Sequence, residues 1–106
     1  MNPKSSLLRH VVLFKFRDSS SEDEVEQVVS SFMSLKNQVP QIVAMEWGKN
    51  ISEENNHQGF THCFVISFRS IQDLTDYQSH PAHLDFQQVL GPHMEKVFVV
   101  DYYSND

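Results

Sequence analysis

Two histidines stand three positions apart in the stretch YQSHPAHLDF, residues 77–86, which opens with a tyrosine. Histidine titrates near neutral pH and can remove a proton from a carbon beside a carbonyl group. A tyrosine hydroxyl can hold the enolate oxygen that then develops. Tyr77 and His83 are therefore candidates for acid/base chemistry on an apolar carbonyl compound, in an aldol-type or Claisen-type condensation or an isomerisation. Such chemistry needs no cofactor.

Two further histidines, His10 and His62, alternate with apolar residues in patterns typical of strands. A polar ring in such surroundings needs a hydrogen-bond partner. One interpretation is a pocket in which several such groups converge on an apolar wall. The other is that they are hydrogen-bonded core residues, and the sequence leaves both open. The residues that would form the pocket are His10, His62, Tyr77 and His83.

The first histidine of the pair, His80, has a structural interpretation that we favour. Its ring nitrogen can accept a backbone N–H, and Pro81 suits the first helical position because its missing N–H costs nothing there. A zinc site is disfavoured, because it wants three protein ligands and the sequence has no HExxH motif and a single cysteine, Cys63. Covalent catalysis is also disfavoured, because no serine, cysteine or lysine stands with a base in a recognisable motif.

Composition restricts the class of protein. A length of 106 residues with 40% hydrophobic residues predicts one folded domain, residues 1–106. The net charge of -6 and the lack of a basic cluster argue against nucleic acid and anionic membranes as partners. A lone cysteine fits a reducing compartment. No signal-peptide pattern follows the N-terminal MNPKSSLLRH, and no stretch approaches the ~20 apolar residues of a membrane helix, so we expect a cytoplasmic protein.

Hydrophobic periodicity predicts the elements that position these residues. The predicted strands span residues 8–17, 42–49, 60–69 and 97–102. A capping box at residues 21–24 begins a helix that should end before Pro40. A second helix begins at Ser70 and resumes at Pro81, and its apolar spacing continues to Met94.

This order of elements is the split βαβ pattern of ferredoxin-like α+β folds, β-α-β-β-α-β, with an antiparallel sheet and helices on one face. Residues 8–17 are mostly apolar on both faces of their strand. The sheet face away from the helices would therefore be apolar too. An apolar sheet face favours a homodimer in which two sheets pack together.

Taken together, the segments of this chain resemble the stress-responsive α/β barrel domain (Dabb) family. The matching segments are RHVVLFKF, MEWGKNIS, QGFTHCFVISFRS, DYQSHPAHLDF and KVFVVDYY, in order along nearly the whole chain. The resemblance implies a ferredoxin-like homodimer whose two sheets form an α/β barrel. In a polyketide cyclase of the family, the last histidine of HPAH is the base and the tyrosine of the DY pair orients the substrate. The resemblance therefore implies that His83 is a base and that Tyr77 orients the substrate.

The resemblance also implies which residues line the pocket and hold substrate. These are His10, His62, Val12, Phe14, Val28, Val29, Phe32, Phe64 and Met94. The chain departs from the cyclase, which has phenylalanines at Val28 and Val29, a tyrosine at Phe32 and a tryptophan at Met94. We therefore expect a reshaped pocket and a different ligand.

Some relatives hold a cation through main-chain carbonyls after the first helix. The matching positions are Lys36, Val39 and Ile42, and oxygen ligands suit Mg²⁺ or Na⁺ better than zinc.

Three functions remain open from the sequence. The first is a homodimer whose pocket binds a small apolar carbonyl or phenolic compound. The second is a cofactor-independent polyketide cyclase or related lyase. The third is a non-catalytic, stress-protective structural protein.

Overall fold

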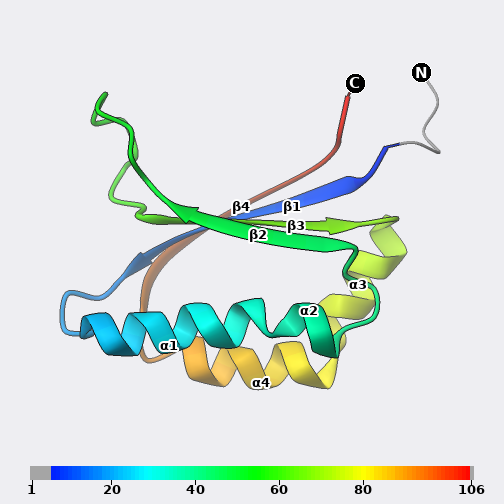
Figure 1. The fold of residues 1–106 in the computed structure, drawn as a ribbon, viewed down its shortest axis with the longest axis horizontal. Helices are drawn as coiled ribbons and strands as arrows, with labels where there is room; N and C mark the ends of the chain where they lie inside the picture. The colour runs from blue at the N-terminus through cyan, green and yellow to red at the C-terminus, as the bar shows by residue number, and fades with distance from the viewer. Residues whose placement is uncertain (1–5, 106) are drawn as a thin grey trace.

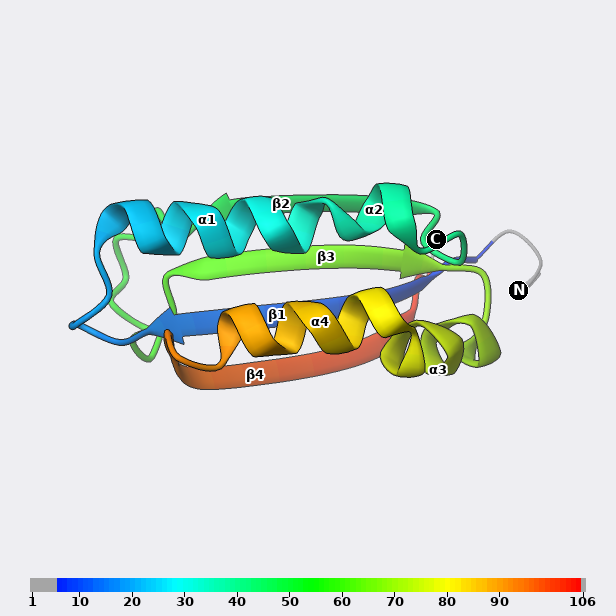
Figure 2. The ribbon, with the colours of Figure 1, turned by 90° about the horizontal axis from the view of Figure 1, so that it is seen from below.

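A four-stranded antiparallel sheet, in the strand order β2-β3-β1-β4, carries the helices on one face (Figures 1 and 2). The computed structural model describes residues 6–105, so the predictions for the first five residues and the last lie outside it. The strands are β1 (Leu8–Phe16), β2 (Ala44–Lys49), β3 (His62–Phe68) and β4 (Met94–Tyr103). The helices are α1 (Glu22–Met33), α2 (Leu35–Gln38), α3 (Ile71–Ser79) and α4 (Pro81–Leu90). The predicted ferredoxin-like α+β fold is confirmed.

The predicted capping box begins α1. Ser21 Oγ accepts the Glu24 N–H at 3.1 Å, and the Ser21 N–H donates to Glu24 Oε1 at 2.9 Å. These two bonds satisfy backbone donors that a helix start otherwise leaves unpaired. The helical segment ends with α2 at Gln38, before Pro40 as predicted. On its buried face, Phe32 stacks on Phe86 of α4 with centroids 4.4 Å apart, so α1 and α4 pack side by side over the sheet (Figure 2).

One residue joins α3 to α4. His80 ends α3 and is also the N-cap of α4, where its Nδ1 accepts the Ala82 N–H at 3.0 Å. Pro81 follows at the first helical position. The predicted cap role of His80 is confirmed, and the extended backbone of His80 turns the chain between the two helices.

The expectation that helical spacing continues to Met94 is wrong. The helix α4 ends at Leu90, and Met94 is the first residue of β4, where it pairs with Phe16 of β1. Pro92 explains the end of the helix, because its nitrogen cannot donate the next helical hydrogen bond. The last strand therefore begins earlier than the alternation of apolar residues indicated.

The two sheet faces differ in exposure. Toward the helices, Phe64 and Phe68 are completely buried. On the opposite face, the side chains of Phe98 and Val100 on β4 are 53% and 43% exposed. The helices cover one face, and the second, partly apolar face has no cover from residues 6–105.

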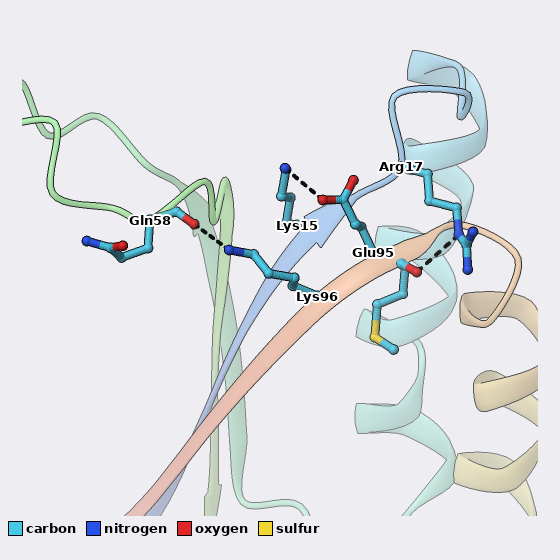
Figure 3. A network of polar contacts seen from close by, with 6 residues as sticks. Lys15, Arg17, Gln58, Glu95 and Lys96 are labelled. Carbon is cyan, nitrogen blue, oxygen red and sulfur yellow. Dashed lines mark hydrogen bonds and ion pairs between the residues drawn. The ribbon is translucent and has the colours of Figure 1, made fainter.

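A network of polar contacts fastens the loop after β2 to the β1–β4 pair (Figure 3). Lys96 Nζ donates to the Gln58 carbonyl at 2.8 Å and lies 4.7 Å from the centroid of the Phe60 ring. On β1, Lys15 forms an ion pair with Glu95 at 2.8 Å. The Lys96 contacts hold the loop beside the end of the sheet at which β1 leads into α1, and the Lys15–Glu95 pair joins β1 to β4 there.

Candidate functional site

Three of the four predicted site residues lie together at one end of the helix layer. His10 comes from β1, Tyr77 from α3 and His83 from α4. The Tyr77 and His83 ring centroids are 4.5 Å apart, and the His10 and Tyr77 centroids are 6.0 Å apart. Tyr77 is 1% exposed, so its ring is fixed by packing. The joint at His80 places the tyrosine and the second histidine on different helices that meet at this point.

These three rings line a pocket of about 550 Å³ between the sheet and α4. The predicted residues that line it are His10, Val12, Phe14, Phe32, Tyr77, His83 and Met94. The sequence reasoning missed the rest of the lining, which is Gln78, Phe86, Gln87, Leu90, Val97 and Val99. Most of the wall is apolar, and the polar groups gather at the end formed by the three rings.

The structure does not bring His62 to this pocket, so the predicted convergence of all four residues is corrected. In the sheet, His62 lies opposite Phe14, whereas His10 lies opposite Ile66, four positions along β3. At the rise of a strand, four positions correspond to roughly 13 Å. His62 instead stacks on Trp47, with centroids 5.8 Å apart.

The remaining predicted lining residues lie outside the pocket as well. Val28 and Phe64 are buried in the core, and Val29 faces a separate groove on the other side of α1.

Hydrogen bonding fixes the tautomer of the candidate base. His83 Nδ1 lies 3.0 Å from the carbonyl oxygen of Gln78. A carbonyl oxygen only accepts, so Nδ1 carries the proton, and Nε2 of the neutral ring holds the free lone pair. Burial lowers the pKa of His83 below its ordinary value; the Gln78 bond opposes this shift, and the charge of His10 adds to it. The ring is therefore neutral at neutral pH and can accept a proton.

Burial acts on Tyr77 in the opposite sense. It raises the pKa of the Tyr77 hydroxyl well above its ordinary value, because an apolar environment disfavours the charged phenolate. The hydroxyl stays protonated through the neutral range and can donate a hydrogen bond to a ligand oxygen.

An acidic residue that the sequence reasoning missed completes the polar end. His10 Nδ1 donates to Asp101 Oδ1 at 2.5 Å, across the β1–β4 pair. A carboxylate accepts, so this bond also leaves Nε2 of a neutral His10 without a proton. In the sequence, Asp101 could have been recognised as the single acidic residue inside the mostly apolar segment KVFVVDYY. Asp101 orients the His10 ring against Tyr77.

The predicted cation positions lie around the end of α2. Val39 and Ile42 are buried, and the Val39 carbonyl accepts the Ile42 N–H at 3.2 Å. Carbonyl groups at a helix end have no partner within the helix, and oxygen is the ligand that Mg²⁺ prefers. The donor chemistry fits a cation, although one of the three carbonyls already has a partner. Among the described residues, no side-chain cluster of His, Cys, Asp or Glu could hold a metal ion. The cation at Lys36, Val39 and Ile42 stays a prediction.

Within residues 6–105, every helix is too short or too polar to cross a membrane.

Comparison with known proteins identifies relatives over nearly the whole chain. The family described as "Stress responsive A/B Barrel Domain" matches residues 8–104. The stress-response A/B barrel domain-containing protein HS1 of Arabidopsis thaliana is 37% identical over 95 residues, which are 90% of this chain and 87% of the relative. Olivetolic acid cyclase of Cannabis sativa is 32% identical over 95 residues, which are 90% of this chain and 94% of the cyclase.

Solved structures share the fold. Hydroxynitrile lyase from Passiflora edulis superposes with a TM-score of 0.90 at 26% identity, over 99% of this chain and 97% of the lyase. A dimeric protein of ferredoxin-like fold from Bacteroides fragilis superposes with a TM-score of 0.72 at 28% identity, over 91% of this chain and 94% of that one.

Proposed function

Because the chain belongs to the family of stress-responsive A/B barrel domains, we propose that its pocket binds a small apolar compound with a carbonyl or phenolic oxygen. The observation that carries this proposal is the contact between Tyr77 and His83, with ring centroids 4.5 Å apart. It sets a protonated hydroxyl beside a neutral imidazole. A ligand oxygen can accept from Tyr77 while a ligand hydroxyl or acidic C–H faces His83 Nε2.

The rest of the pocket supports this class of ligand. Its volume of about 550 Å³ suits a small organic molecule, and its walls include Phe86, Val97 and Val99. Apolar walls favour an uncharged ligand body, since burying an unpaired charge there would be costly. The ligand would place its oxygen at the end with the three polar rings.

A second candidate function is cofactor-independent catalysis in the same pocket, as a polyketide cyclase or related lyase. His83 Nε2 would take a proton from a carbon beside a carbonyl, and Tyr77 would donate to the resulting enolate oxygen. In an intramolecular aldol condensation, that carbon attacks a second carbonyl carbon of the same molecule, and the new alkoxide takes up a proton. The tautomer that the Gln78 carbonyl sets at His83 favours this reaction, and two relatives are named as a cyclase and a lyase.

We also propose a homodimer in which the exposed sheet faces pack together. The apolar side chains of Phe98 and Val100 stand exposed on that face, and solved relatives are dimeric. We propose in addition that residues 1–106 form a single domain and that the protein is cytoplasmic.

The first test is a titration of the His83 ring by NMR, alone and with a panel of apolar phenols and β-diketones. A depressed pKa that moves on binding supports the pocket. Tyr77→Phe and His83→Ala should each weaken binding, while His62→Ala, which changes a residue outside the pocket, should not. Unchanged binding in both Tyr77→Phe and His83→Ala would show that the ligand does not occupy this pocket. No response in the wild type would contradict ligand binding and favour a structural, stress-protective role.

A turnover assay separates binding from catalysis. Linear polyketides and other β-dicarbonyl compounds are incubated with wild type and with His83→Ala, and the products are analysed by mass spectrometry. Product that forms with the wild type and not with the variant supports the catalytic candidate. Binding without turnover would exclude it for these substrates and leave the binding function in place.

A further inference from the structure

A second groove lies between α1 and the β2 edge of the sheet, away from the site described above. It has a volume of about 870 Å³, and it shares no lining residue with the first pocket. Its apolar walls come from Phe16 on β1, Val25 and Val29 on α1, and Trp47 on β2. The groove and the pocket are therefore separate spaces on the same face of the sheet.

Three buried phenylalanines separate the two spaces. Phe14, Phe32 and Phe64 are each 2% exposed or less, and their ring centroids lie between 4.7 and 5.7 Å apart. Rings packed at these distances leave no passage for a ligand. A molecule bound in the groove would thus not reach Tyr77 or His83.

The sheet side of the groove is an aromatic wall. Trp47 is 40% exposed and stacks on His62, with an interplanar angle of 5°, and Phe16 meets His62 edge-on at 4.9 Å. His62 is 8% exposed, and its Nδ1 is bonded to Thr61 Oγ1 at 2.8 Å. Its Nε2 has no hydrogen-bond partner among the described residues. Burial, with a smaller effect of Lys49, lowers the pKa of His62, so the wall is uncharged at neutral pH.

The helix side of the groove is acidic. Glu22 and Glu26 line it from successive turns of α1, and Asp18 lines it from the preceding turn. Residues four apart on a helix lie on the same side, so both glutamates stand above the apolar wall. Of the two lysines at the groove, Lys15 is paired with Glu95 on β4 (Figure 3). Lys49 stands on the sheet side and would direct a bound cation toward α1.

We propose that this groove is a second ligand site and that it binds an arylalkylamine, a small flat aromatic molecule with a protonated amine. The ring packs against Trp47 and Phe16, and the ammonium group lies toward Glu22 and Glu26.

Trp47 is the only tryptophan of the chain, so its fluorescence reports on ligands that bind beside it, and the variants below assign the response to the groove. The wild-type protein is titrated with 2-phenylethylamine, with 3-phenylpropanoate as the anionic analogue and with 2-phenylethanol as the neutral one. We expect a saturable change in emission with the amine, at concentrations at least threefold below those the two analogues require. Equal or tighter binding of the anion would overturn the assignment to amines.

Variants locate the site. Glu22→Gln with Glu26→Gln should weaken amine binding roughly threefold or more, as expected for two exposed charge pairs. Val25→Phe, at a half-buried wall position, should weaken binding by occupying part of the groove, while circular dichroism shows an unchanged fold. His83→Ala should leave amine binding unaltered.

NMR chemical shifts give the complementary evidence, because the Trp47 indole N–H and the His62 ring should move with the amine. No saturable response from any of the three compounds would overturn the second site. Shifts confined to Tyr77 and His83 would also overturn it, since the amine would then occupy the first pocket.

Discussion

The two histidines of HPAH use the same ring atom in opposite ways. His80 Nδ1 accepts the Ala82 N–H, whereas His83 Nδ1 donates to the Gln78 carbonyl. Each bond fixes a different tautomer, so one ring has a structural role and the other presents a free lone pair. Residue type and spacing alone do not distinguish these roles, and the local backbone does.

Replacement of His80 tests the cap. His80→Ala should lower the free energy of unfolding by about 1 kcal/mol, the usual cost of losing an N-cap side chain. His80→Asn should retain most of the stability, because asparagine is a good N-cap residue. Urea unfolding monitored by circular dichroism gives both values. A midpoint for the alanine variant equal to that of the wild type would contradict the cap role.

Stability should fall in mild acid because of His62 and His83. The pKa of each ring is lowered in the folded state by burial, against an ordinary value of 6.5. Below that value the unfolded chain binds more protons than the folded one, so the free energy of unfolding decreases as the pH falls from 6.5 toward the folded pKa values. Above pH 7.5 neither ring contributes to the pH dependence of the free energy of unfolding.

The measurement is urea unfolding at pH 7.5 and pH 5, for wild type and for His62→Gln with His83→Gln. The double variant should lose less stability between the two pH values. Equal losses in both proteins would show that these rings are not responsible.

At the scale of elements, local patterns predicted the fold well. Alternation located four strands, the capping box located the start of α1, and Ser70 and Pro81 located the starts of α3 and α4. All of these signals act over a few residues. The predicted starts of β2 and β4 were less accurate, because pairing with distant strands decides where these two strands begin.

The site was predicted less completely because it depends on register between distant segments. Asp101 meets His10 only because β1 and β4 pair with those residues opposite, 91 positions apart in the chain. The same dependence separates His62 from His10, although both stand on apolar strands. Residue type indicated the chemistry, and sheet register decided which residues meet.

An aromatic pair joins α1 to α4. Phe86 is 3% exposed and stacks on Phe32. Phe86→Ala should cost about 3–5 kcal/mol, because the cavity it leaves adds to the lost burial. Phe86→Leu, which keeps most of the volume, should cost clearly less. Chemical denaturation measures both, and a loss below about 1 kcal/mol for the alanine variant would contradict a tightly packed contact.

For the whole molecule, the exposed sheet face is the main unexplained surface. Single apolar residues on a surface are common, but a contiguous apolar face on a sheet is typical of an interface. The edge strand β4 contributes most of this exposure. The proposed homodimer would bury it.

Two charge substitutions separate folding from assembly. Phe68→Asp places an unpaired charge in the completely buried core and should prevent folding. Phe98→Asp places the same charge on the exposed face and should yield a folded monomer. Circular dichroism reports the fold, and sedimentation velocity reports the mass. A Phe98→Asp variant that remains a dimer would contradict the proposed interface.

The joint at His80 has a consequence for how the pocket could change over evolutionary time. A helix turns about 100° for each residue, so one insertion or deletion between Tyr77 and His83 would swing the imidazole away from the tyrosine. Substitutions at the joint, in contrast, would alter the angle between α3 and α4 in small steps. The separation between the Tyr77 hydroxyl and the His83 imidazole could thus change through inherited substitutions that leave both rings intact.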